Sequence, residues 1–158
     1  MNKFVIVYLL FFSGLVGAQP LPAIDADHEH QQWLKDQFSA KHQALIPVVA
    51  VADMFHGCNQ ERKSEPVNYQ VKDLVTRVDR DKLAQMLSIC LAEDSPKSDV
   101  ALNFGLESCF SEQFSHLPTA EKAEKMVLVT NTIKQLPRAE RQKSFTLCVT
   151  EQAIQYLQ

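Results

Sequence analysis

The spacing of the four cysteines constrains the fold of this chain more than any other feature. They lie at Cys58, Cys90, Cys109 and Cys148, and the closest two are 19 residues apart. A zinc site or a redox pair usually places two cysteines within a few residues of each other, and no such pair occurs here. In an exported chain, an even number of widely spaced cysteines therefore predicts two disulfide bonds.

The predicted helices between the cysteines favour one of the three pairings that four cysteines allow. Cys58 and Cys90 each lie on a predicted helix, with one cysteine-free helix between them. Cys109 and Cys148 have the same arrangement later in the chain. The simplest prediction is Cys58–Cys90 and Cys109–Cys148, in two helical halves of the same plan that are either related or only alike.

Apolar residues at helical spacing predict an all-α fold. The clearest pattern places Val67, Val71, Leu74, Val75 and Val78 on one face of a helix. Comparable patterns along the chain predict a single-domain bundle of about seven short helices, with no convincing strand. The predicted helices cover residues 28–46, 47–58, 66–78, 79–91, 98–114, 118–136 and 137–157.

Two copies of the phrase Leu-Pro-x-Ala-Glu, which begin at Leu117 and Leu136, predict the starts of the last two helices. Proline has a fixed φ and no N–H, so it suits the first turn of a helix and disrupts the interior. The copies indicate either an internal duplication or a common way to begin a helix.

By the same argument, Pro47 is expected to end one helix and open the next. The segment 48–52 is almost wholly apolar, which predicts a helix at the centre of the domain. A short buried strand is the alternative, although no partner strand is evident elsewhere. The helix before Pro47 would pack through Trp33, Leu34, Phe38, Lys41 and Leu45.

The first residues have the pattern of a secretory signal peptide. Lys3 precedes the apolar run 4–16, and small residues end at Ala18. A membrane anchor is the competing interpretation, but it needs about 20 apolar residues. We therefore predict a signal peptide over 1–18, a flexible tail over 19–27 and a helical domain over 28–158. The mature protein would be periplasmic or secreted, with no integral membrane segment.

The charge of the chain argues against two classes of partner. The formal net charge is −3, with 16 basic and 19 acidic residues. Nucleic acids and anionic membrane surfaces attract basic proteins. We therefore expect no nucleic-acid partner.

The densest group of potential metal ligands lies near the start of the mature chain. Imidazoles and carboxylates are ligands for zinc, copper and nickel. His28 and His30 are two residues apart, however, so they would lie on different sides of a helix. A solvated helix start explains the whole group, and we expect no metal site there. The group comprises Asp25, Asp27, His28, Glu29 and His30.

Asp53 and His56 form the second candidate site. They lie three residues apart on the most apolar predicted helix, so they can share a face. A carboxylate that orients an imidazole is a usable general base. The alternative is a structural pair on one polar strip of the helix. Because the sequence names no third catalytic group and no known catalytic motif, we expect no enzyme, catalytic residue or cofactor.

The aromatic residues could line an apolar pocket between helices, although such residues more often form the core. Export, disulfides and the absence of a catalytic motif predict a non-enzymatic protein-binding or accessory factor. A carrier of an apolar small molecule is the alternative, so the expected partner is an unknown protein or a small apolar ligand. The pocket candidates are Trp33, Phe38, Phe55, Tyr69, Phe104, Phe110, Phe114, Met126 and Phe145.

Overall fold

The computed structural model describes residues 23–157, with side chains described from Glu29 onward. The chain divides into two compact units, Met1–Leu34 and Lys35–Gln158. The described part of the first unit is entirely helical. The predicted signal peptide over 1–18 and residues 19–22 of the predicted tail lie outside the described residues. Residues 23–27 of that tail belong to the first helix.

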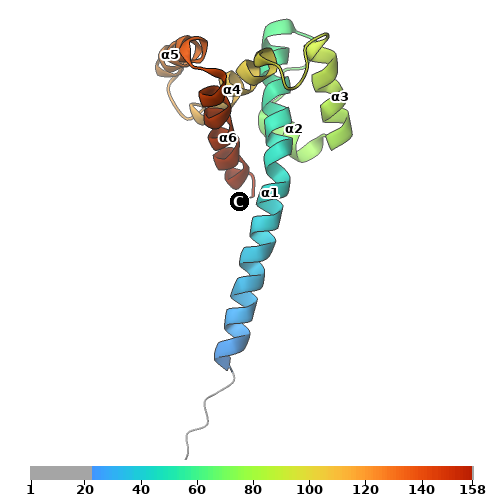
Figure 1. Cartoon of the computed structure of the whole chain (residues 1–158), viewed down its shortest axis with the longest axis vertical. Helices are drawn as coiled ribbons and strands as arrows, with labels where there is room; N and C mark the ends of the chain where they lie inside the picture. Colours follow the sequence, from blue (N-terminus) through green and yellow to red (C-terminus); the bar gives the residue numbers. More distant parts are fainter. Residues whose placement is uncertain (1–22, 158) are drawn as a thin grey trace, which may run out of the picture. The chain divides into compact units, whose positions relative to one another are not determined.

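The protein is all-helical, as predicted, and the described residues contain six helices and no strand (Figure 1). Each helix coincides with a segment that has apolar residues at helical spacing. The helices are α1 (Ala23–Arg62), α2 (Val71–Arg77), α3 (Arg80–Leu91), α4 (Asp99–Gln113), α5 (Thr119–Gln135) and α6 (Arg138–Gln155).

The prediction of about seven helices is wrong because α1 continues through Pro47. A proline inside a helix removes one hydrogen bond and costs about 3 kcal/mol. Pro47 is exposed, so its ring takes no space in the core. Val49, Ala52 and Phe55 on the following turns are fully buried. Their packing offsets the cost of the proline. Residues 48–52 are helical, so the alternative of a buried strand there is wrong.

The predicted packing face of the first helix is also wrong in part. Trp33, Leu34 and Phe38 are 48–55% exposed, and Lys41 is exposed, whereas Leu45 packs against the core. Helical spacing shows only that these side chains share a face. It does not show that another element covers that face.

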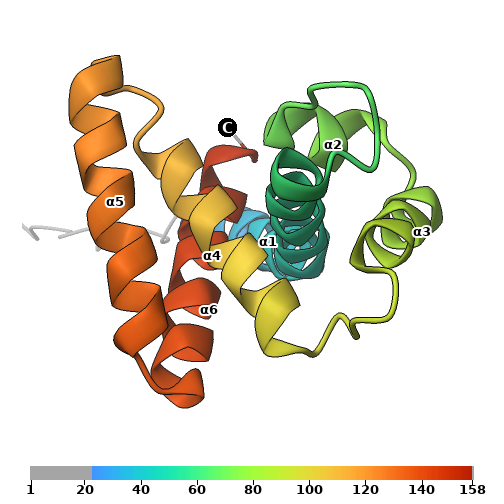
Figure 2. The same cartoon turned by 90° about the horizontal axis from the view of Figure 1, so that it is seen from above.

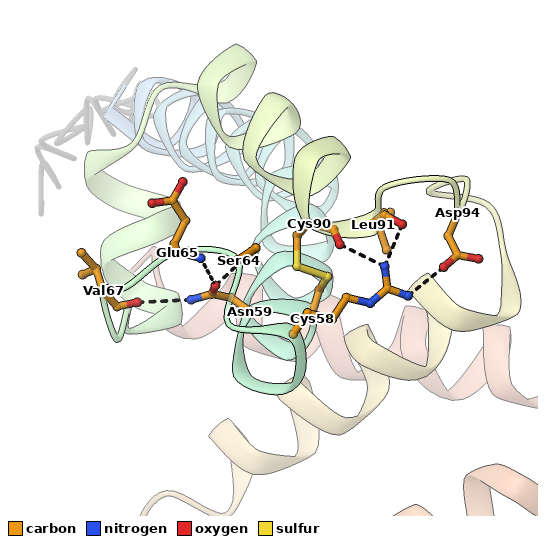
Figure 3. The surroundings of a disulfide bond; sticks show 9 residues. Cys58, Asn59, Ser64, Glu65, Val67, Cys90, Leu91 and Asp94 are labelled. Atoms are coloured by element: carbon orange, nitrogen blue, oxygen red, sulfur yellow. Dashed lines mark hydrogen bonds and ion pairs between the residues drawn. A yellow bond between two sulfur atoms is a disulfide. The ribbon is translucent and has the colours of Figure 1, made fainter.

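The third predicted helix is shorter than expected, since α2 begins at Val71 rather than at residue 66. Hydrogen bonds from the end of α1 hold the preceding loop in a non-helical path (Figure 3). The amide of Asn59 donates to the carbonyl of Val67 at 3.2 Å, and its Oδ1 accepts from the backbone N–H of Glu65 at 2.7 Å. Val67, which was expected on the buried face, is 50% exposed.

Within the second unit, α1 separates two groups of helices (Figure 2). Helices α2 and α3 lie on one side of it, and α4, α5 and α6 lie on the other. The predicted disulfides are confirmed: Cys58–Cys90 joins α1 to α3, and Cys109–Cys148 joins α4 to α6. We call α1–α3 the first half and α4–α6 the second half. Each disulfide therefore lies within one half.

The two halves meet where α1 crosses α4. A Cβ atom on Gly57 would overlap the backbone carbonyl of Phe104, so only glycine allows this approach of the two backbones. On α4, Gly105 faces the ring of Phe145 and the side chain of Met54. The Arg62 guanidinium lies over the Phe104 ring, 5.3 Å from its centroid. Contacts between the halves are thus close but noncovalent.

Candidate functional site

The structure describes only part of the group of potential metal ligands near the start of the mature chain. The side chains of Asp25, Asp27 and His28 lie outside the described residues. Glu29 and His30 are exposed, and the His30 ring stacks on Trp33. No group of three potential metal ligands occurs among the side chains that the structure describes.

Asp53 and His56 are brought together, but through a third residue that sequence reasoning missed. The hydroxyl of Ser108, on α4, donates to Oδ1 of Asp53 at 2.8 Å. The same oxygen of Ser108 lies 2.8 Å from Nδ1 of His56. Asp53 is fully buried and Ser108 is 3% exposed. The sequence does hold one signal for this contact, since Ser108 lies beside Cys109 on the buried face of an apolar helix. A buried hydroxyl needs a hydrogen-bond partner.

Burial keeps this network neutral. It raises the pKa of Asp53 to about 8, and the negative charge of Glu112 adds to the rise, against the hydrogen bond from Ser108. Oδ2 of Asp53 has no hydrogen-bond partner among the described residues. Burial also lowers the pKa of His56, with a smaller contribution from Lys122. At neutral pH, Asp53 is therefore a protonated acid and His56 an uncharged imidazole.

The order of the three groups differs from that of a catalytic triad. In a triad, the imidazole lies between the serine and the carboxylate and accepts the hydroxyl proton. Here Ser108 lies between the other two, and its proton points to Asp53 rather than to His56. Ser108 is only 3% exposed, although it and His56 line a concavity of about 300 Å³. This geometry suits a structural link between α1 and α4.

The polar network extends to α6. The side-chain amide of Gln152, which is 3% exposed, lies 3.0 Å from the hydroxyl of Tyr156. Its Oε1 contacts Sγ of Cys109 at 3.1 Å. That sulfur is in a disulfide and has no proton to donate, so this is a packing contact. Burial raises the pKa of Tyr156, which keeps the phenol protonated.

An apolar concavity lies between α4 and α5 in the second half. We call it the α4–α5 groove; its volume is about 330 Å³. Phe110 on α4 and Phe114 just after it line the groove, with ring centroids 6.2 Å apart. Phe55, Phe104 and Phe145 are core residues instead. The apolar lining comprises Leu106, Phe110, Phe114, Leu128, Val129, Ile133 and Leu136.

Helix α5 buries little of its apolar surface. Ile133 is its only buried residue, whereas Val127 and Leu128 are 61% and 62% exposed. Leu128 lies at the edge of the groove, so the groove is open to solvent there. An apolar surface of this kind is typical of a binding site.

Known proteins supply no guide to the function of this site. Comparisons with protein families, curated proteins and solved structures find no match to this chain. None of the described helices is both long enough and apolar enough to cross a membrane.

Proposed function

We propose that this protein is an exported, non-enzymatic carrier that holds an apolar small molecule in the α4–α5 groove. The observation that carries the proposal is the groove itself. Ligand sites are concave and mostly apolar, with a volume of roughly 300–1,000 Å³ and a few polar groups. A groove of about 330 Å³ with aromatic and aliphatic walls fits the lower end of that range.

Two further observations support the proposal. The two disulfides fit an oxidising compartment outside the cytoplasm. The candidate pair for acid–base chemistry, Asp53 and His56, lies in the neutral network around Ser108. That network stabilises the contact between the two halves. The groove, and not the network, is therefore the proposed ligand site.

A protein-binding role is the second candidate, and it is the one that the sequence favoured. The exposed side chains of Val127 and Leu128 support it, because a partner could cover both when it inserts a side chain into the groove. A small ligand would leave Val127 in water. The two roles therefore differ in whether Val127 contributes to binding.

A neutral lipophilic fluorescent probe tests the proposal. The purified mature protein, with both disulfides intact, should bind the probe at one saturable site. Thr132 is exposed but lines the groove, so Thr132→Trp should fill the groove and abolish binding while the fold is retained. Asn131→Trp, at the exposed neighbouring position outside the lining, is the matched control and should bind normally.

The result has two informative alternatives. If Thr132→Trp and Asn131→Trp bind the probe equally well, the groove is not the site and the proposal is refuted. If the groove binds the probe but Val127→Asp removes that binding as fully as Thr132→Trp does, the wider surface carries affinity and the protein-binding role replaces the carrier.

A further inference from the structure

Six lining residues of the α4–α5 groove form a row along α5, and the only charged lining residue begins that row. The residues that α5 and its C-terminal end contribute are Lys125, Leu128, Val129, Thr132, Ile133 and Leu136, which recur at steps of three and one. They therefore follow one face of the helix for about 16 Å, at a rise of 1.5 Å per residue. Lys125 begins this row, and Leu136 ends it.

The ammonium group of Lys125 forms only a weak ion pair within the protein. Nζ lies 3.7 Å from Oε1 of Glu121, one turn earlier on the same helix. The two side chains are 43% and 49% exposed. An exposed ion pair at this distance contributes little stability and exchanges readily with another anion. Lys125 can therefore pair with an anionic group at the end of the groove.

From this arrangement we infer that the preferred ligand is a straight-chain aliphatic carboxylate, with its carboxylate at Lys125 and its alkyl chain along α5 toward Leu136. This inference rests on the proposed function, since it names the ligand class for the same groove. A single cation and an apolar channel match one anionic head and one unbranched chain. Thr132 and Ser144 also line the groove, and they supply no second charge.

Competition experiments with the full mature protein separate the head group from the chain. The neutral fluorescent probe is displaced by a series of straight-chain carboxylates and by primary alcohols of the same lengths, all below their critical micelle concentrations. Each added methylene should raise affinity about fourfold until the groove is full, after which the gain should stop. Each carboxylate should bind roughly fivefold more tightly than its matched alcohol.

Three variants on α5 test the role of Lys125. Lys125→Met should remove the preference for carboxylates, so that each carboxylate binds this variant no more tightly than its matched alcohol does. Lys134→Met, an exposed position outside the groove, is the matched control and should keep the preference. Glu121→Gln should strengthen carboxylate binding alone, because it removes the anion that competes for Lys125.

The outcomes distinguish the inference from the proposed function. If alcohols bind as tightly as carboxylates, or if Lys125→Met keeps the preference, the inference is wrong although the groove still binds apolar ligands. If neither series displaces a probe that the groove binds, the inference alone is wrong. If Thr132→Trp does not block probe binding, the proposed function fails and the inference fails with it.

Discussion

Replacing Asp53 with asparagine should change how the stability of this protein depends on pH. Burial raises the pKa of Asp53 to about 8 in the folded state, against a usual value of 3.8. Between these values the folded state binds more protons than the unfolded state, so stability falls as pH rises. The contribution of this group is complete below about pH 3.8 and is lost as pH approaches 8.

The size of the effect follows from proton linkage. Each pH unit between the two pKa values lowers the free energy of unfolding by about 1.4 kcal/mol. Between pH 4 and pH 7, this one carboxyl group should therefore cost the wild type about 4 kcal/mol. An asparagine side chain cannot ionise, so Asp53→Asn should lose this part of the pH dependence while the new side-chain oxygen still accepts from Ser108.

Urea unfolding followed by circular dichroism measures the effect directly. For a chain of this size, about 4 kcal/mol corresponds to a shift of roughly 2 M in the urea midpoint. The difference between the variant and the wild type should grow by that amount from pH 4 to pH 7. This comparison cancels the constant cost of the new amide N–H, which has no partner near Oδ2.

One control variant and one contrary result complete this test of Asp53. Glu93→Gln removes one carboxyl group from an exposed position and should leave the pH profile close to that of the wild type. Glu112 and Tyr156 also lie near Asp53, but they are present in every protein compared. If the curves of Asp53→Asn and the wild type stay parallel from pH 4 to pH 8, Asp53 is not a buried neutral acid.

Three further stability predictions follow from the contacts within and between the halves. Gly57→Ala should destabilise the fold by about 2 kcal/mol or more, because its new methyl group meets backbone on α4; a melting temperature equal to that of the wild type would contradict this close approach. Replacing Cys58 and Cys90 together with serine should cost about 4 kcal/mol by loop-closure arithmetic, measured by urea unfolding; a cost below about 1 kcal/mol would show that the bond is strained or redundant. Arg62→Ala should cost about 1–3 kcal/mol in the same assay, since Arg62 donates to two carbonyls at the end of α3 (Figure 3), and Arg62→Lys should recover little of it.

The sequence by itself determined the helical class and the disulfide pairing of this protein. Apolar residues at steps of three and four are a local signal, and each predicted helix after the first two appears in the structure near its expected place. The pairing of Cys58 with Cys90 and of Cys109 with Cys148 followed from the order of helices between them. Both inferences depend on segments that the sequence itself defines.

Only the tertiary structure decided which of these local features meet. The helix-breaking preference of Pro47 is local, but the burial of Val49 and Phe55 that overrides it comes from neighbours later in the chain. Asp53 and Ser108 are 55 residues apart, and no periodicity in either helix predicts that their side chains share a hydrogen bond. The α4–α5 groove likewise depends on how far α5 stands from α4, a distance that packing sets because many weak contacts compete across the whole domain.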